Sequence, residues 1–306
     1  MPIRVHPWLK KYGAALKLAV TLTLLAAAFR MVCFDTLAET FRAASAGPLV
    51  IAALALILGG FAGAASWFCI LRLGLPDLRF RDAAACHWIG MFFNSFLPSN
   101  IGGDIVKGTL IHSKAPVSFT VASLFIDRAV NLALLLGIGC FTWLLQGGGI
   151  LSAAAAFSAF LALLALALTF ILNRFRHPPF SAHPHMGTVN LLLAAFASQF
   201  LKTWSNVLVA SALGLSIPPA CVWSVVPLFG LVSALPISIG GLGVRELAAQ
   251  GLAGPLQVDN THLIALSLAG HGLTVLVNLF GAIPFFARRS RTADTGEPRC
   301  YSGQSQ

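Results

Sequence analysis

Long apolar runs constrain this chain more than any other feature. Runs of about 20 residues, the length of a helix that crosses roughly 30 Å of hydrocarbon, recur from Ala14 to Phe286. Only 10% of the residues are charged and 57% are hydrophobic, whereas soluble chains carry about 25% charged residues. The polar stretches 173–188 and 288–306 are shorter than a soluble domain of about 50 residues. We therefore expect an all-α polytopic membrane protein.

Two kinds of apolar segment can be distinguished. Two regions, 83–126 and 217–256, are interrupted by Pro-x-x-x-Gly-Gly, which breaks a helix, so each should form two half-helices that meet at a bend. Such a bend is tolerated in a membrane only where protein or a water-filled cavity satisfies the backbone. Asp259, Asn260 and Thr261 are N-cap candidates for the last span. The uninterrupted segments, each predicted to span fully, are about 12–33, 48–71, 129–146, 151–172, 189–213 and 262–286.

Basic residues beside the spans indicate the orientation. Of the 20 Lys and Arg residues, 15 flank one side, only Arg42 and Arg245 flank the other, and Arg30, Arg128 and Lys202 lie inside spans. Both termini are therefore predicted to be cytoplasmic, and the net charge of +10 gives no reason to expect nucleic acid as a partner. An even number of crossings follows. Six full spans fit if the broken regions are re-entrant hairpins of opposite orientation; the alternative is eight or more spans.

The two broken regions contain the same unusual segment. LPSNIGGDIVK at Leu97–Lys107 and LPISIGGLGVR at Leu235–Arg245 share six identities, and a Leu-Gly-Leu that ends a full span precedes each. Two halves, about 10–146 and 150–287, would then form an inverted repeat, an architecture of transporters. The alternative is two unrelated hairpins. We expect one transmembrane domain, 1–290, followed by a short cytoplasmic tail, 291–306.

Charged side chains inside spans are costly, about 2.5–3.5 kcal/mol each on insertion scales, and need a reason. Lys202 forms a polar stripe with Gln199 and Asn206 on an otherwise apolar helix, so it either contacts substrate or makes a structural hydrogen bond. Asp127 and Arg128 open the third span. Arg128 either pairs with a carboxylate, holds a phosphate, or reaches the interface.

The broken hairpins offer a second set of candidates. A helix that restarts after a Gly-Gly bend points free N–H groups toward the break, which suits an anion. A basic residue follows the first Gly by five positions in both copies, so a phosphate site is sensible, although a structural turn with surface charges is the alternative. The candidate substrate-binding residues there are Gly102, Gly103, Asp104, Lys107, Gly240, Gly241, Arg245 and Glu246.

The sequence contains no signature of catalysis or of metal binding. The six cysteines are scattered without a C-x-x-C pair and are interpreted as small buried hydrophobes. His87 and His271 lie in apolar surroundings and are interpreted as hydrogen-bonded core residues. Hydrolase, metalloprotease and phosphate-loop motifs do not occur in the sequence. We expect no catalytic residue, no metal and no cofactor.

Three segments, FNSFLPSNIGGDIVKG, ASLFIDRAVNL and ALPISIGGLGVRELA, resemble the membrane domain of lysylphosphatidylglycerol synthases and its stand-alone bacterial relatives. The resemblance covers about 10–287. It points to the glycines and charged residues of both hairpins, to Pro236, and to Asp127 and Arg128. Lys107 stands where relatives often have Arg, and Asp127 where many have Glu. The resemblance implies a lipid flippase.

The working hypothesis is a translocase of the bacterial inner membrane that moves an anionic or zwitterionic lipid, or a lipid-linked intermediate, between leaflets. No synthase-like segment follows the spans in this sequence, so the aminoacylated lipid of the synthases is not assumed to be the substrate. The alternatives are a non-transporting partner of envelope-lipid biosynthetic enzymes, a head-group transferase that uses Asp104 or Glu246 as base, and a small-solute transporter.

Overall fold

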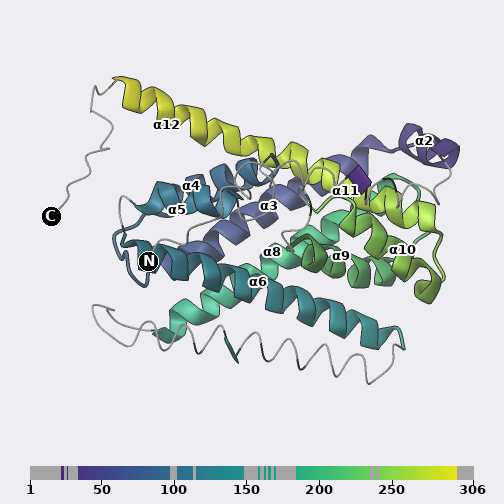
Figure 1. Ribbon diagram of the computed structural model, residues 1–306, viewed down its shortest axis with the longest axis horizontal. Coiled ribbons are helices and arrows are strands. Elements are labelled where there is room, and N and C mark those ends of the chain that lie inside the picture. Colours follow the sequence, from purple (N-terminus) through teal and green to yellow (C-terminus); the bar gives the residue numbers. More distant parts are fainter. Residues whose placement is uncertain are drawn as a thin grey trace.

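A computed structural model describes residues 34–96, 102–112, 115–147, 184–234 and 241–294, together with isolated residues such as Ser238. Every regular element in these ranges is helical, which confirms the all-α prediction (Figure 1). The elements are α2 (Phe34–Arg42), α3 (Ala46–Leu71), α4 (Phe80–Asn94), α5 (Gly102–His112), α6 (Val117–Leu145), α8 (Pro184–Ala212), α9 (Pro219–Ala234), α10 (Val244–Leu256), α11 (Asn260–Asn278), the 3₁₀ turn η1 (Leu279–Gly281) and α12 (Ala282–Asp294).

Three described helices are long and apolar enough to cross a membrane: α3, α6 and the run Asn260–Arg288 through α11 and α12. α8 is as long as α6, but its polar stripe makes it less apolar. The predicted spans 48–71, 189–213 and 262–286 coincide with α3, α8 and α11–α12, whereas 12–33 and 151–172 lie outside the continuously described ranges. Six full spans therefore stays a prediction.

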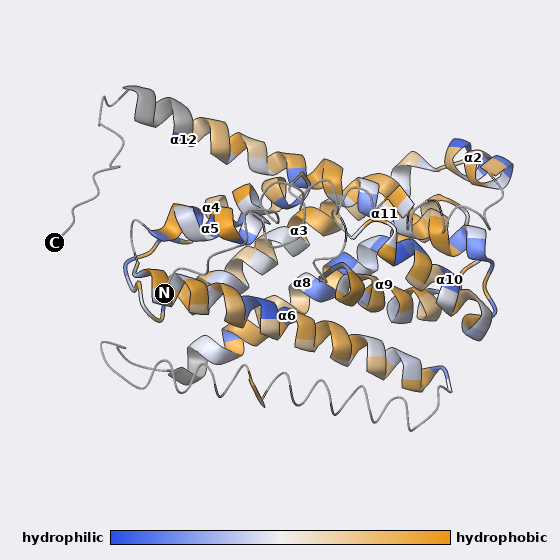
Figure 2. Cartoon of the chain, in the orientation of Figure 1, coloured by the Kyte–Doolittle hydropathy of each residue, from blue (hydrophilic) through white to orange (hydrophobic). Residues whose placement is uncertain are grey.

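The long helices are largely apolar (Figure 2), and large apolar side chains on them are exposed. On α3, Val50, Leu54, Leu58 and Phe61 are each between 45% and 60% exposed and follow one helical face. A continuous exposed apolar face on a long helix marks contact with lipid rather than with water. The chain is thus a membrane protein.

The third span begins earlier than predicted. The sequence suggested a helix over 129–146, but α6 starts at Val117, directly after Pro116, and runs for 29 residues. No proline occurs after Pro116 in this stretch, and the first glycine is Gly137, so nothing stops the helix from including the ten residues assigned to the broken region. Asp127 and Arg128 consequently lie in the interior of α6, and the expectation that they open the span was wrong.

Each interrupted region contains two helices, one on either side of its Pro-x-x-x-Gly-Gly segment, as predicted, although 83–126 also includes the first ten residues of α6. α4 ends at Asn94 and α5 begins at Gly102, while α9 ends at Ala234 and α10 begins at Val244. The two members of each pair pack against each other. Figure 1 shows the α4–α5 pair at one end of the molecule and the α9–α10 pair at the other. The predicted break in each region is confirmed.

The helix contacts of the first half recur in the second. α3 packs on α4 and α6, α4 on α5, and α5 on α6; in the same way α8 packs on α9 and α11, α9 on α10, and α10 on α11. Contacts between the halves also correspond, since α6 meets α9 and α8 while the α11–α12 run meets α4 and α3. α3 and α8 cross in opposite directions, because Ser198 Oγ donates to the Gly59 carbonyl and Ser205 Oγ to the Ala52 carbonyl.

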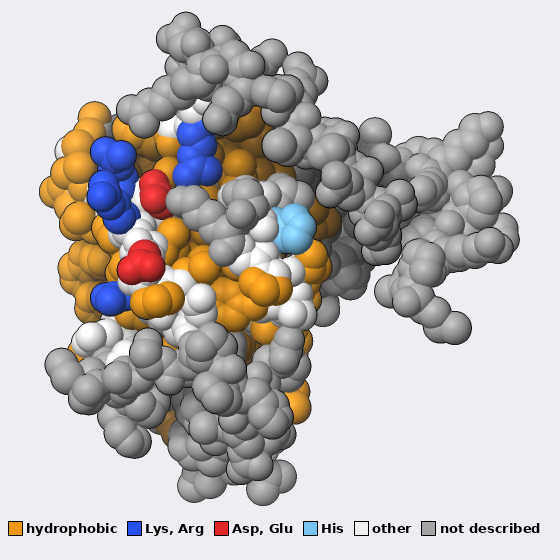
Figure 3. Space-filling model, turned by 90° about the vertical axis from the view of Figure 1, so that its left-hand side faces the viewer, with side chains coloured by type: hydrophobic (Ala, Val, Ile, Leu, Met, Phe, Trp, Pro, Cys, Tyr) orange, Lys and Arg blue, Asp and Glu red, His pale blue; other side chains and the backbone are white. Residues whose placement is uncertain are grey.

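Charged side chains gather at the end of the molecule where α3 ends and α4 begins. Arg72, Arg79 and Arg81 are exposed there, and Figure 3, which looks at this end, shows Lys and Arg side chains beside Asp and Glu. Lys107, which the sequence also assigned to this side, is only 4% exposed. It lies inside the helix bundle and is not part of this surface charge.

Asp259 is the N-cap of α11, as predicted. Its Oδ1 accepts hydrogen bonds from the backbone N–H groups of Thr261 at 2.7 Å and His262 at 3.4 Å. Burial acts to raise the pKa of the Asp259 carboxyl, but these hydrogen bonds outweigh it, and the pKa lies below its ordinary value. The charged cap therefore stabilises the start of the last long helix.

Replacing Asp259 with Ala should lower the free energy of unfolding by about 1 kcal/mol at neutral pH. Because the folded pKa is depressed, this stabilisation is present above the unfolded pKa of about 3.9 and is lost as the pH falls through the folded value. Denaturant unfolding of the purified protein in detergent at several pH values measures both effects. The exposed Asp77→Ala is the control; equal losses in the two variants would contradict the capping role.

Candidate functional site

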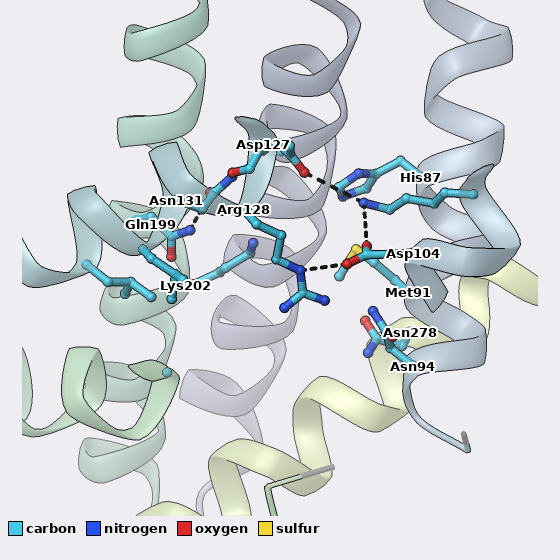
Figure 4. Close-up of a pocket in the computed structure, with 15 residues that line it drawn as sticks. His87, Met91, Asn94, Asp104, Asp127, Arg128, Asn131, Gln199, Lys202 and Asn278 are labelled. Atoms are coloured by element: carbon cyan, nitrogen blue, oxygen red, sulfur yellow. Dashed lines mark hydrogen bonds and ion pairs between the residues drawn. The ribbon is translucent and has the colours of Figure 1, made fainter. Parts of the chain in front are cut away.

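A cavity of about 290 Å³ lies between the helices, and both hairpins reach it. Asn94 and Asp104, beside the break between α4 and α5, line it from the first hairpin, and Gly230 of α9 lines it from the second. The remaining polar lining comes from α4, α5, α6, α8 and α11, with His87, Lys107, Asp127, Arg128, Asn131, Gln199, Lys202 and Asn278 (Figure 4).

The cavity is deep along the helices. Arg128 follows the start of α6 by 11 residues, which is about 17 Å at 1.5 Å per residue. Lys202 precedes the end of α8 by 10 residues, about 15 Å. Figure 2 shows α6 and α8 as largely apolar helices with hydrophilic stretches. The charged groups therefore lie well inside the thickness that α6 and α8 would span.

An ion-pair network joins α5 to α6. Arg128 Nε donates to Asp104 Oδ2 at 2.6 Å. Lys107 Nζ lies 3.4 Å from Asp104 Oδ1 and 3.7 Å from Asp127 Oδ2. The Lys107 ammonium also lies over the Trp67 ring, 5.1 Å from its centroid. Of the roles predicted for Arg128, pairing with a carboxylate is therefore present.

Amide side chains extend this network to α8. Asn131 Nδ2 donates to the carbonyl and to Oδ1 of Asp127, at 2.7 and 3.1 Å. Gln199 Nε2 in turn donates to Asn131 Oδ1 at 2.5 Å. The polar stripe predicted on α8 is thus hydrogen-bonded, through Gln199, to the polar face of α6.

Within the described residues, Lys202 takes no part in this network of hydrogen bonds and ion pairs. Its side chain extends from α8 toward Arg128 (Figure 4). Among the described residues, its ammonium makes neither a hydrogen bond nor an ion pair, whereas Asp104 and Asp127 are both paired. The described lining residues include three basic side chains (Lys107, Arg128 and Lys202) and two carboxyl groups, so with all five ionised they carry one surplus positive charge.

The glycines of the first hairpin allow close packing. Gly103 N donates to Asn94 Oδ1 at 2.8 Å, so α5 starts against the last residue of α4. A Cβ at Gly103 would overlap the Gly90 carbonyl and the Asn94 side chain. Gly102 and Gly103 are the first residues of α5, and they place Asp104 at the cavity.

Replacing Gly103 with Ala should therefore push α5 away from α4 and cost about 1–3 kcal/mol or more in the free energy of unfolding. Gly108→Ala is the matched control in the same helix, because its Cβ would meet its nearest neighbours at 3.4 and 3.5 Å, ordinary contact distances. Unfolding in detergent measures both variants. If they proved equally stable, the close approach of the two half-helices would be refuted.

The second hairpin places its charged residues elsewhere. Glu246 is fully buried and accepts from Gly243 N at 2.6 Å and Ser267 Oγ at 2.8 Å, so it caps its own helix. Arg245 Nη1 lies 3.1 Å from His271 Nδ1, and its guanidinium lies over the Phe229 ring. Neither residue lines the cavity, nor does Gly241, which turns with φ +82°.

Among the predicted site residues, Asp104, Lys107, Asp127, Arg128 and Lys202 thus come together at the cavity. Gly240 and Pro236 lie outside the described residues. The role of the second motif in binding stays a prediction.

Several lining residues were not predicted from the sequence. His87, Met91 and Asn94 share one face of α4 at spacings of four and three, which is the signal that was overlooked. His271 is hydrogen-bonded, as expected, but neither ring nitrogen of the buried His87 has a hydrogen-bond partner within the described ranges, so the expectation of a bonded core histidine was wrong there. His87 belongs to the cavity.

Apolar outer faces around a charged internal cavity define an α-helical membrane protein with a polar site between its helices. A family model described as the lysylphosphatidylglycerol synthase TM region matches residues 14–281, and the chain belongs to this family. The match includes every described helix from α2 to α11, and it confirms the resemblance noted from the motifs. A comparison with curated proteins finds no match.

Proposed function

We propose that this protein is a lipid translocase of the bacterial inner membrane that moves an anionic or zwitterionic phospholipid, or a lipid-linked intermediate, between leaflets. The observation that carries the proposal is the surplus cation in the cavity. Lys202 lies deep between apolar helices without a described partner, and an uncompensated charge there is costly. A lipid phosphate that binds beside Lys202 and Arg128 offsets that cost.

Two further features support translocation rather than static binding. The corresponding contacts of α3–α6 and α8–α11 fit two inverted halves, 10–146 and 150–287, of one transmembrane domain. The first hairpin contributes Asn94 and Asp104, beside its break, to the cavity, and the second contributes Gly230 of α9. Rocking of one half against the other would expose the cavity to each leaflet in turn, as in transporters built from inverted repeats.

In the proposed topology, the exposed Arg72, Arg79 and Arg81 face the cytoplasm, following the distribution of positive charge. Both termini are then cytoplasmic, and the two hairpins enter the membrane from opposite sides. Enzymes of envelope-lipid biosynthesis would supply or consume the lipid.

A leaflet-transfer assay tests the function. The purified protein is reconstituted into phosphatidylcholine vesicles that contain acyl-labelled phosphatidylglycerol or phosphatidylethanolamine, and a membrane-impermeant quencher reports the label remaining in the inner leaflet. We expect faster transfer of at least one lipid than in protein-free vesicles. Rates equal to those of empty vesicles, with and without an imposed pH gradient or membrane potential, would refute the proposal.

A further inference from the structure

We infer that the lipid head group accepted by this cavity is anionic, carries hydroxyl groups and lacks an amine: a phosphodiester of a polyol. The inference rests on the proposed function and narrows it to one substrate class. It follows from the hydrogen-bonding capacity that the described residues leave unused around the cavity.

The oxygens of both carboxylates already have partners, so they are not available to an ammonium group on the ligand. Asp104 Oδ2 accepts from Arg128 and Asp104 Oδ1 faces Lys107. Asp127 Oδ1 accepts from Asn131, and Asp127 Oδ2 faces Lys107. All four carboxylate oxygens therefore already face a cation or an amide donor. An amine on the ligand would have to displace one of these partners or share an oxygen with it.

A cation, by contrast, is available. The Lys202 ammonium has three donors, and no acceptor among the described side chains satisfies them. The Arg128 guanidinium is 32% exposed and points into the same space (Figure 4). A phosphate between these two side chains would receive charge-assisted hydrogen bonds from α6 and α8 and would neutralise the surplus charge.

The opposite wall offers neutral groups. Both ring nitrogens of His87 and the Oδ1 of Asn278 are buried atoms without a described hydrogen-bond partner, and both residues line the cavity at 6% and 7% exposure. Figure 4 places them on the side away from Lys202. A hydroxyl group both donates and accepts, so it can pair with either ring nitrogen of His87 and with the amide oxygen, whereas an ammonium only donates. The wall of α4 and α11 therefore fits a polyol.

Head-group charge is tested by binding. Native mass spectrometry of the detergent-solubilised protein would compare phosphatidylglycerol, phosphatidylethanolamine and lysylphosphatidylglycerol, whose head groups carry net charges of about −1, 0 and +1 at neutral pH. We expect phosphatidylglycerol to bind at least about tenfold more tightly than either amine-bearing lipid, the difference that one charge-assisted hydrogen bond makes. Equal binding, or tighter binding of lysylphosphatidylglycerol, would overturn the inference.

Charge reversal at Lys202 provides the sharper test. Lys202→Glu turns the surplus charge from positive to negative, so the preference should invert toward lysylphosphatidylglycerol. Arg81→Glu makes the same change in charge at the exposed end of the molecule and should leave the preference unchanged. If the lipid preference shifted equally in both variants, the overall charge of the protein would explain it, and the assignment to the cavity would be overturned. If Lys202→Glu does not fold, the comparison of the three lipids on the wild-type protein still tests the inference.

The polyol is tested with a lipid of equal charge. Phosphatidylmethanol carries the same phosphodiester but no glycerol hydroxyls, so wild-type protein should prefer phosphatidylglycerol and His87→Phe should reduce that preference. No preference in the wild type would refute the polyol. These binding results are separable from translocation: a protein that binds phosphatidylglycerol selectively but transfers nothing would refute the proposed function alone, and one that transfers all three lipids equally would refute this inference alone.

Discussion

Lys202→Met is expected to lose most phospholipid binding while its free energy of unfolding stays the same or rises. Methionine keeps the length and the apolar stem of lysine, so packing against α3 is preserved. It removes a charge that has no described partner and that costs desolvation free energy when the cavity is empty. A purely structural lysine would show the opposite, because its loss would destabilise the protein.

Thermal and denaturant unfolding in detergent, combined with titration by phosphatidylglycerol, measures both quantities on one preparation. Binding should weaken at least about tenfold, as for a lost charge-assisted hydrogen bond. Arg81→Met removes an exposed cation and should change neither quantity. A destabilised Lys202→Met variant that binds normally would show that Lys202 serves the fold rather than the site.

Asp104→Asn is expected to cause the largest loss of stability among the cavity variants. The Asp104 carboxylate faces Arg128 at 2.6 Å and Lys107 at 3.4 Å, and its side chain is only 13% exposed. Asparagine leaves three cations with the single carboxylate of Asp127. Breaking a buried pair costs about 3–5 kcal/mol, and the lower end applies because Arg128 is 32% exposed.

A double-mutant cycle separates the ion pair from other effects of this substitution. Arg128→Gln removes the surplus charge that Asp104→Asn creates, so the double variant should recover part of the lost stability. Asp77→Asn, an exposed change of the same kind, should cost little alone or combined with Arg128→Gln. Strictly additive losses at Asp104 and Arg128 would mean that their contact contributes nothing to stability.

The hairpins illustrate what local sequence determines. A proline and paired glycines disfavour helix wherever they occur, so the break in each region could be predicted without knowing what surrounds it. The start of α6 was harder to predict, because Val117–Ile126 could belong either to the broken region before it or to the span after it. The helix boundary follows from the absence of a breaker after Pro116.

The partners of the charged residues required the tertiary structure. Asp104 and Arg128 are 24 residues apart and meet only because α5 packs on α6. Lys107 was counted among the basic residues that flank one side of the spans, although α5 turns its side chain inward, toward Trp67 and Asp127. Counting basic residues along a sequence cannot separate a surface lysine from one that a helix such as α5 carries inward.

The similarity of the two motifs also misled the prediction of the site. Lys107 and Arg245 occupy matching positions in the two motifs, which suggested one site lined by both. Lys107 meets a carboxylate of α6, whereas Arg245 meets His271 of α11, the helix in the matching position. Matching positions in a repeat predict similar backbones, but the charge of the facing helix decides which half forms the polar site.

The most direct test is the initial rate of labelled phosphatidylglycerol transfer in vesicles that contain equal amounts of folded wild-type protein or Lys202→Met. Transfer through the cavity predicts a wild-type rate well above that of protein-free vesicles and a variant rate at least about tenfold lower, close to the protein-free value. Wild-type and Lys202→Met rates that are equal would contradict a translocation route through this site.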